Sequence, residues 1–119
     1  MRDEGLYLED IVDGVDAVAR FVAGIDKEQF LSDERTMSAV LHKLLVIGEA
    51  AAHVSKETRE RHPEIEWADV VAFRNFAIHV YFSVDLERVW MAATLDAPLL
   101  REQVANIIST DYPYDEDEA

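Results

Sequence analysis

The sequence MSAVLHKLLVIGEAAA at residues 37–52 carries the most regular helical pattern of the chain. Its large apolar residues recur at the i, i+3, i+4 spacing of one helix face. Small residues follow at Gly48 and at 50–52, where a second helix can pack closely. The pattern predicts the longest helix of the protein, residues 34–60, which His62-Pro63 would end.

Helical periodicity continues on both sides of this stretch. Residues 25–32 form a connection, with Ser32 or Asp33 as N-cap of the long helix. A kink or break is expected near Asp96, because Pro98 follows it. We predict further helices over residues 6–22, 67–81, 86–95 and 97–109. No segment shows the alternation of a strand, so the fold class prediction is all-α, an antiparallel bundle of four to five helices.

Length and composition bound the class of protein. The 119 residues are enough for one domain, which we place at residues 1–110, with an acidic, disordered tail at 111–119. There is no cysteine, no apolar run long enough to cross a membrane and no apolar signal segment, so we expect a cytoplasmic protein. The formal net charge of −14 disfavours tight binding to nucleic acid, which depends on cations.

The octet RNFAIHVY at residues 74–81 concentrates the polar chemistry of the chain. Arg74 interrupts an apolar stripe and therefore needs a carboxylate, a helix end or a ligand, and Glu49 is the best carboxylate within the chain. Asn75 and His79 are four positions apart, so the amide can orient the imidazole. Arg74 and His79 are separated by about 140° on an ideal helix. Either the arginine reaches round the helix, or a second copy of the helix completes the site.

The pattern Arg74-Asn75-x3-His79-x-Tyr81 resembles the signature of the HepT-like (DUF86) branch of the HEPN superfamily. The resemblance covers about residues 6–108, excluding the acidic tail. Other stretches that are similar to the family are Tyr7-Leu8-Glu9-Asp10-Ile11, Ile47-Gly48-Glu49-Ala50, Ile65-Glu66-Trp67, and Asp85 with Val89-Trp90.

The resemblance implies a helical homodimer that acts as a metal-independent endoribonuclease without a cofactor, the toxin of a toxin–antitoxin pair. Arg74 and His79 would be catalytic, and Asn75 and Glu49 would support them. The implied antitoxin resembles a minimal nucleotidyltransferase, which in several systems silences the toxin by adenylylating the motif tyrosine, here Tyr81. RNA cleavage needs a base, an acid and a cation, and a two-fold dimer would supply two histidines.

Less specific interpretations of the same residues remain open. Arg74, Asn75 and His79 would be structural if the arginine were a buried partner of Glu49. Glu49 and His53, at i and i+4, have the spacing of metal ligands, but two good ligands rarely make a site, and we expect no metal. A non-catalytic HEPN module, which binds a nucleotide or pairs with a nucleotidyltransferase, is the alternative function and suits the acidic composition.

Overall fold

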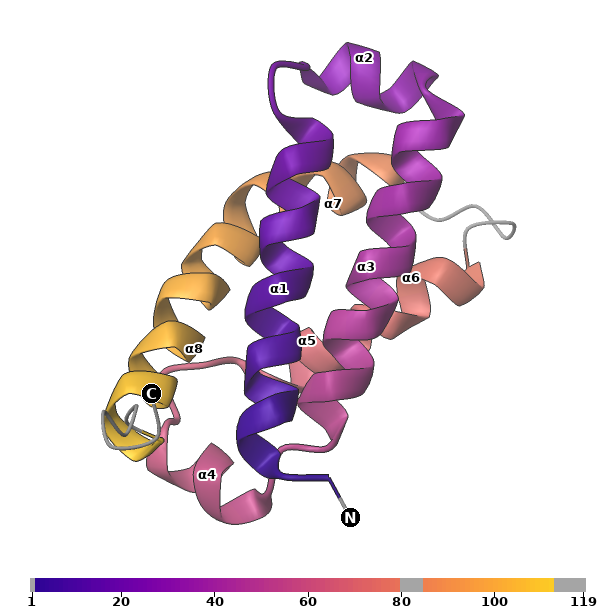
Figure 1. Ribbon diagram of the computed structural model, residues 1–119. Coiled ribbons are helices and arrows are strands. Elements are labelled where there is room, and N and C mark those ends of the chain that lie inside the picture. The colour runs from indigo at the N-terminus through magenta and orange to yellow at the C-terminus, as the bar shows by residue number, and fades with distance from the viewer. Residues whose placement is uncertain (1, 80–84, 113–119) are drawn as a thin grey trace.

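The structure, a computed structural model, describes residues 2–79 and 85–112, and within these two ranges it contains helices and no strand (Figure 1). The predicted all-α class is confirmed. The elements are α1 (Glu4–Val22), α2 (Lys27–Ser32), α3 (Glu34–Ala52), α4 (Lys56–Arg61), α5 (Trp67–Ala72), α6 (Arg74–His79), α7 (Leu86–Met91), the π-helix η1 (Ala92–Asp96) and α8 (Ala97–Asp111).

The core lies where α1 packs against α3 on one side and α8 on the other (Figure 1). Most apolar residues that recur at helical spacing in these helices are buried. Gly14 lets α1 approach α3 closely, because a Cβ at this position would lie 2.7 Å from Cγ1 of Ile47. The fully buried side chains of the three helices include Leu8, Ile11, Val18, Val40, Leu44, Ile47, Val104 and Ile107.

The long helix ends earlier than predicted. α3 begins after the N-cap Asp33, as expected, but it stops at Ala52 rather than at residue 60. Ser55 then adopts extended backbone angles, and its hydroxyl accepts a hydrogen bond from the backbone N–H of Thr58 at 3.2 Å. This N-cap starts α4 as a separate helix, because a serine side chain can replace the bond that a continuous helix would have supplied.

The single helix predicted for residues 67–81 is two short helices. α5 ends at Ala72, and Phe73 is followed by α6. The backbone N–H of Phe73 donates to Val70 O at 3.0 Å, and that of Phe76 donates to Phe73 O at 3.1 Å. These three-residue spacings tighten the turn between the two helices. The last two residues of the predicted helix lie outside the described residues.

Near Asp96, where a kink or break was predicted, the chain forms a π-helix. The chain stays helical from α7 through η1 into α8, and the N–H of Ala97 donates to Ala92 O, five residues earlier. Pro98 has no N–H and its ring would clash with the Thr94 carbonyl in a regular α-helix, so the wider turn accommodates it. At the start of α8, Leu99 is 57% exposed, whereas Leu100 is buried.

The lower end of the bundle in Figure 1 is held together by the start of α1, α4 and the end of α8. The Glu4 carboxylate accepts hydrogen bonds from the Ser55 N–H, from Thr58 Oγ1 at 3.0 Å and from the Tyr112 hydroxyl at 2.7 Å. Oδ2 of Asp111 lies 2.9 Å from Nε2 of His62. We call these side chains the terminal clamp.

The terminal clamp includes the two residues that follow residue 110. Asp111 belongs to α8 and Tyr112 contacts α1, so the packed part of the chain extends two residues beyond residue 110. The expected disorder of the remaining tail concerns residues 113–119, which lie outside the described residues. None of the helices in the described part of the chain is long and apolar enough to cross a membrane.

Candidate functional site

Arg74 is the first residue of α6, and its position depends on Gly48 of α3. A Cβ at residue 48 would lie 2.7 Å from the backbone N of Arg74 and 2.9 Å from the carbonyl oxygen of Val71. Only a residue without a side chain allows the α5–α6 turn to approach α3 this closely. The small-residue stretch predicted to receive another helix therefore receives the start of α6.

This approach brings Arg74 to Glu49, the partner predicted from the sequence. Nη1 of Arg74 donates to Oε1 of Glu49 at 3.2 Å. The side chains are 39% and 53% exposed, so the pair lies at the surface and the interpretation of a buried structural pair is wrong. An exposed ion pair contributes only about 0–1 kcal/mol, and an incoming anion can compete for the guanidinium.

The arginine retains donors for such an anion. A guanidinium has five N–H groups in a planar fork. The bond to Glu49 is the only hydrogen bond of the Arg74 side chain to residues 2–76 and 85–112, whose side chains the structure describes. Nε and Nη2 can therefore meet two oxygens of a phosphate group without the loss of the Glu49 contact.

The other residues of the octet are placed to different degrees. Asn75 is exposed on α6. His79 is the last residue of α6, five positions after Arg74, but its side chain lies outside the described residues. The contact of Asn75 with the imidazole and the angular separation from Arg74 stay predictions. Tyr81, the expected modification site, also lies outside the described residues.

Aromatic packing fixes α6 relative to α5. Phe73 is 3% exposed and forms part of the core. Its ring lies 5.9 Å from that of Phe76, with 23° between the ring planes. The start of α6 is thus held by a buried side chain immediately before Arg74, which limits the positions that the arginine backbone can adopt.

His53, the C-cap residue of α3, packs against an aromatic ring. His53 stacks on Tyr7 of α1, with ring centroids 4.7 Å apart and 9° between the planes. Arg2 lies over the Tyr7 ring, with Cζ 5.0 Å from its centroid. Within the described ranges no group of three or more histidine, aspartate or glutamate side chains could hold a metal ion. This stack could not be predicted from the sequence, because Tyr7 and His53 are 46 residues apart.

Comparison with known proteins identifies relatives over most of the chain. The family described as Ribonuclease HepT-like matches residues 11–107. A protein of Thermococcus cleftensis named as a probable ribonuclease HepT is 37% identical over 95 residues, covering 80% of this chain and 86% of its own length. A protein of Methanocaldococcus jannaschii named as a putative RNase is 32% identical over 103 residues, covering 87% and 94%.

A third relative, from Caldanaerobacter subterraneus and also named as a putative RNase, is 32% identical over 108 residues, covering 91% of this chain and 96% of its own length. No solved structure gives a significant match. The family match includes α6 with Arg74 and His79 and the Glu49 position of α3. This chain belongs to the HepT-like ribonuclease family.

Proposed function

We propose that this protein is an endoribonuclease that cleaves RNA by general acid–base chemistry, with Arg74 and His79 as its catalytic residues. The main support for the proposal is the surface position of Arg74 at the start of α6. Its Nη1 bonds the Glu49 carboxylate, and its other N–H groups can bind a phosphate. Membership of a ribonuclease family supports the same reading.

The chemistry assigns one task to each side chain. His79 removes the proton from a ribose 2′-hydroxyl, whose oxygen attacks the adjacent phosphorus. Arg74 binds the phosphate oxygens and stabilises the charge that develops on them. The bond from phosphorus to the 5′-oxygen breaks, and the 5′-oxygen takes a proton from a second acid. The product ends in a 2′,3′-cyclic phosphate, and no step uses a metal ion.

The second acid is the reason to propose a dimer. One chain offers one histidine in the octet, and a two-fold arrangement brings His79 of a second copy into a shared cleft. α6 lies at the periphery of the molecule in Figure 1, outside the α1–α3 pair, where another copy can approach it.

The direct test is cleavage of a labelled, randomised oligoribonucleotide pool by the purified chain in the presence of a chelator. Arg74→Ala and His79→Ala should each reduce the rate by about a hundredfold or more, because each removes a catalytic group. His42→Ala is the matched control, an exposed histidine of α3. The same pool made of DNA should stay intact, since it lacks the 2′-hydroxyl.

Cleavage that requires added divalent metal, or that survives Arg74→Ala, would contradict the mechanism. An intact pool in every condition, together with binding of a nucleotide or of a nucleotidyltransferase, would favour the non-catalytic module. The net charge of −14 is the observation that keeps this second candidate in view.

The dimer has a separate test, because the chain contains no cysteine. Asn75→Cys places one thiol on the exposed face of α6, and a short bismaleimide should join two such chains in high yield. Glu57→Cys, at an exposed position of α4, is the control and should stay largely uncrosslinked. Equal yields from the two variants, or a monomer by light scattering at micromolar concentration, would contradict a cleft lined by two α6 helices.

We further propose that a minimal nucleotidyltransferase silences the enzyme as the antitoxin of a toxin–antitoxin pair. It would transfer AMP from ATP to the Tyr81 hydroxyl, which loses its proton, and pyrophosphate would be released. The attached phosphate would occupy Arg74, and the nucleoside would exclude RNA. Intact-mass measurement after co-expression should show added AMP on the wild type and none on Tyr81→Phe. Silencing without any added mass would mean that complex formation alone inhibits the enzyme.

A further inference from the structure

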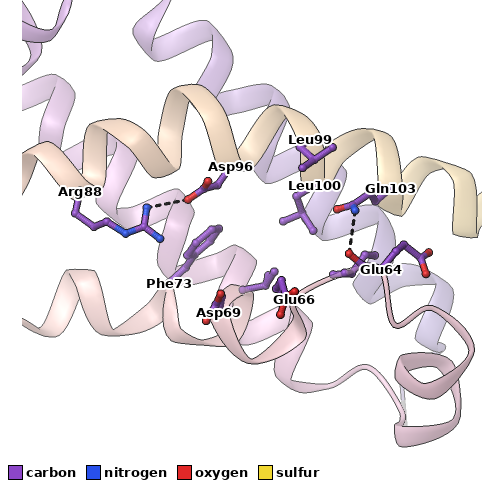
Figure 2. A pocket seen from close by; sticks show the side chains of 11 residues that line it. Glu64, Glu66, Asp69, Phe73, Arg88, Asp96, Leu99, Leu100 and Gln103 are labelled. Carbon is purple, nitrogen blue, oxygen red and sulfur yellow. Dashed lines mark hydrogen bonds and ion pairs between the residues drawn. The ribbon is translucent and has the colours of Figure 1, made fainter.

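A hollow of about 170 Å³ lies between α5, with the residues before it, and the α7–η1–α8 helix (Figure 2). Its floor is apolar and consists of Ile65, Val70, Phe73 and Leu100, each of them buried in the core. An engineered apolar cavity of about 150 Å³ is large enough for benzene. The hollow therefore has the size for one large apolar side chain, such as leucine or phenylalanine. We call it the α5–α8 cup.

Polar contacts close both ends of the cup. At one end Nη1 of Arg88 donates to Oδ2 of Asp96 at 2.8 Å (Figure 2). At the other end Nε2 of Gln103 donates to the carbonyl oxygen of Glu64 at 3.2 Å. A cup bounded in this way accepts the tip of a side chain rather than an extended run of apolar residues.

The rim of the cup combines negative charge with exposed apolar surface. Glu66 and Asp69 are exposed along the α5 side, and neither forms an ion pair within the described parts of the chain. The charge of Arg88 is offset by Asp96. On the α8 side Leu99 is 57% exposed, and Leu95 of η1, one turn earlier, is 62% exposed. Exposed large apolar side chains beside a formed hollow are typical of interaction sites.

We propose that the α5–α8 cup binds a partner protein through one leucine or phenylalanine flanked by lysine or arginine. The apolar tip fills the cup, and the flanking cations lie against Glu66 and Asp69. A second copy of this chain fits poorly, because it has 25 acidic residues and only 11 basic ones. In a two-fold contact, Glu66 and Asp69 of one copy would lie near the same carboxylates of the other and repel them.

The cup lies directly behind the candidate active site. Phe73 is part of its floor, and Arg74 is the next residue of the chain. A side chain seated in the cup would contact the turn that positions Arg74 without covering the arginine itself. The proposal concerns binding alone and does not depend on RNA cleavage.

The test adds three short synthetic peptides, one at a time, to the full chain labelled with ¹⁵N. Binding is followed by the NMR signals of the backbone amides. The first peptide has a leucine between two pairs of lysines, the second has alanine in place of the leucine, and the third has glutamates in place of the lysines. The first should shift the amides of Val70, Phe73 and Leu100. The second should bind about tenfold more weakly, because burial of the leucine is lost. The third should not bind.

Two variants that remove the same amount of charge distinguish binding at the rim of the cup from attraction to the overall negative charge of the protein. Glu66→Gln/Asp69→Asn should weaken binding of the leucine peptide several-fold and reduce its dependence on salt. Glu9→Gln/Asp13→Asn, which removes the same charge from an exposed face of α1, should leave binding unchanged. Equal binding of the alanine peptide, equal effects of the two variants, or cup amides that shift with the concentration of the chain alone would each overturn the proposal. The last result would identify a second copy as the occupant.

Discussion

Gly48 decides how close α6 comes to α3, and through this distance it decides whether Arg74 meets Glu49. The space that a methyl group would need is already filled by backbone atoms of the α5–α6 turn. Backbone atoms cannot rotate away as the end of a flexible side chain can, so a larger residue would push the turn outward. The Nη1–Oε1 distance of 3.2 Å would then increase.

Gly48→Ala should destabilise the protein by about 1–3 kcal/mol, because overpacking exceeds the gain of about 1 kcal/mol in helix propensity. Urea denaturation measures this change. Gly5→Ala is the control, since its Cβ would meet Tyr112 Cδ1 at 3.5 Å, an ordinary contact. This variant should be as stable as the wild type or slightly more stable. A Gly48→Ala protein of unchanged stability and RNA cleavage would mean that the turn is not confined as described.

At the scale of the element, α2 shows how a six-residue helix is maintained. Asp26 caps it by accepting from the backbone N–H of Gln29 at 2.9 Å, and the Gln29 side chain accepts from the Asp26 N–H at 2.9 Å. Phe30 is fully buried, and its ring lies 5.2 Å from that of Trp90 in α7. The capping box thus holds a core side chain that braces the helix leading into η1.

Asp26→Ala should cost about 1 kcal/mol, because the first turn of α2 loses its side-chain cap. Tryptophan fluorescence during urea denaturation reports this loss, since Trp90 lies against Phe30. Glu28→Ala removes one carboxylate from the same helix at an exposed position without a cap bond and should be nearly neutral. If both substitutions cost the same, the effect belongs to charge and not to the capping box.

The same elements show what the sequence could predict. α1, α3 and α8 were predictable because their apolar faces repeat over several turns. The separation of α4 from α3 and of α5 from α6 was not, because neither boundary contains a proline, and Ser55 and the contact at Gly48 decide them. The Glu49 contact was predictable because an arginine among apolar residues needs a partner. The cup was not, because its walls come from two separate segments, residues 64–73 and 88–103.

At the scale of the whole molecule, the terminal clamp makes stability depend on pH. Burial raises the pKa of Glu4, but hydrogen bonds from Ser55, Tyr112 and Thr58 outweigh this effect, so its pKa lies below the usual value. The pKa of Asp111 is also lowered, chiefly by its hydrogen bond with His62. A carboxyl with a lowered folded-state pKa contributes stability that is complete above its unfolded pKa and is lost as the pH falls through the folded pKa.

Glu4→Gln should therefore lower the free energy of unfolding at neutral pH, and its difference from the wild type should shrink as the pH falls below about 4.3, the usual pKa of glutamate. Urea denaturation at steps from about pH 7 to about pH 3 measures the difference. Glu9→Gln is the control, an exposed glutamate of α1. If the difference in free energy of unfolding stays constant over this range, the contribution of Glu4 comes from its packing and hydrogen bonds and not from its ionisation.

The Glu4–Tyr112 hydrogen bond joins residues 108 positions apart, and this separation has a kinetic consequence. The entropy lost on closing a chain loop increases with its length, so contacts between distant residues tend to form after local ones. We expect the helices to assemble before this bond closes, leaving it absent from the folding transition state. Loss of the bond should then accelerate unfolding while the folding rate stays nearly unchanged. The Glu4–Tyr112 bond would thus lengthen the lifetime of the native state without directing how the chain folds.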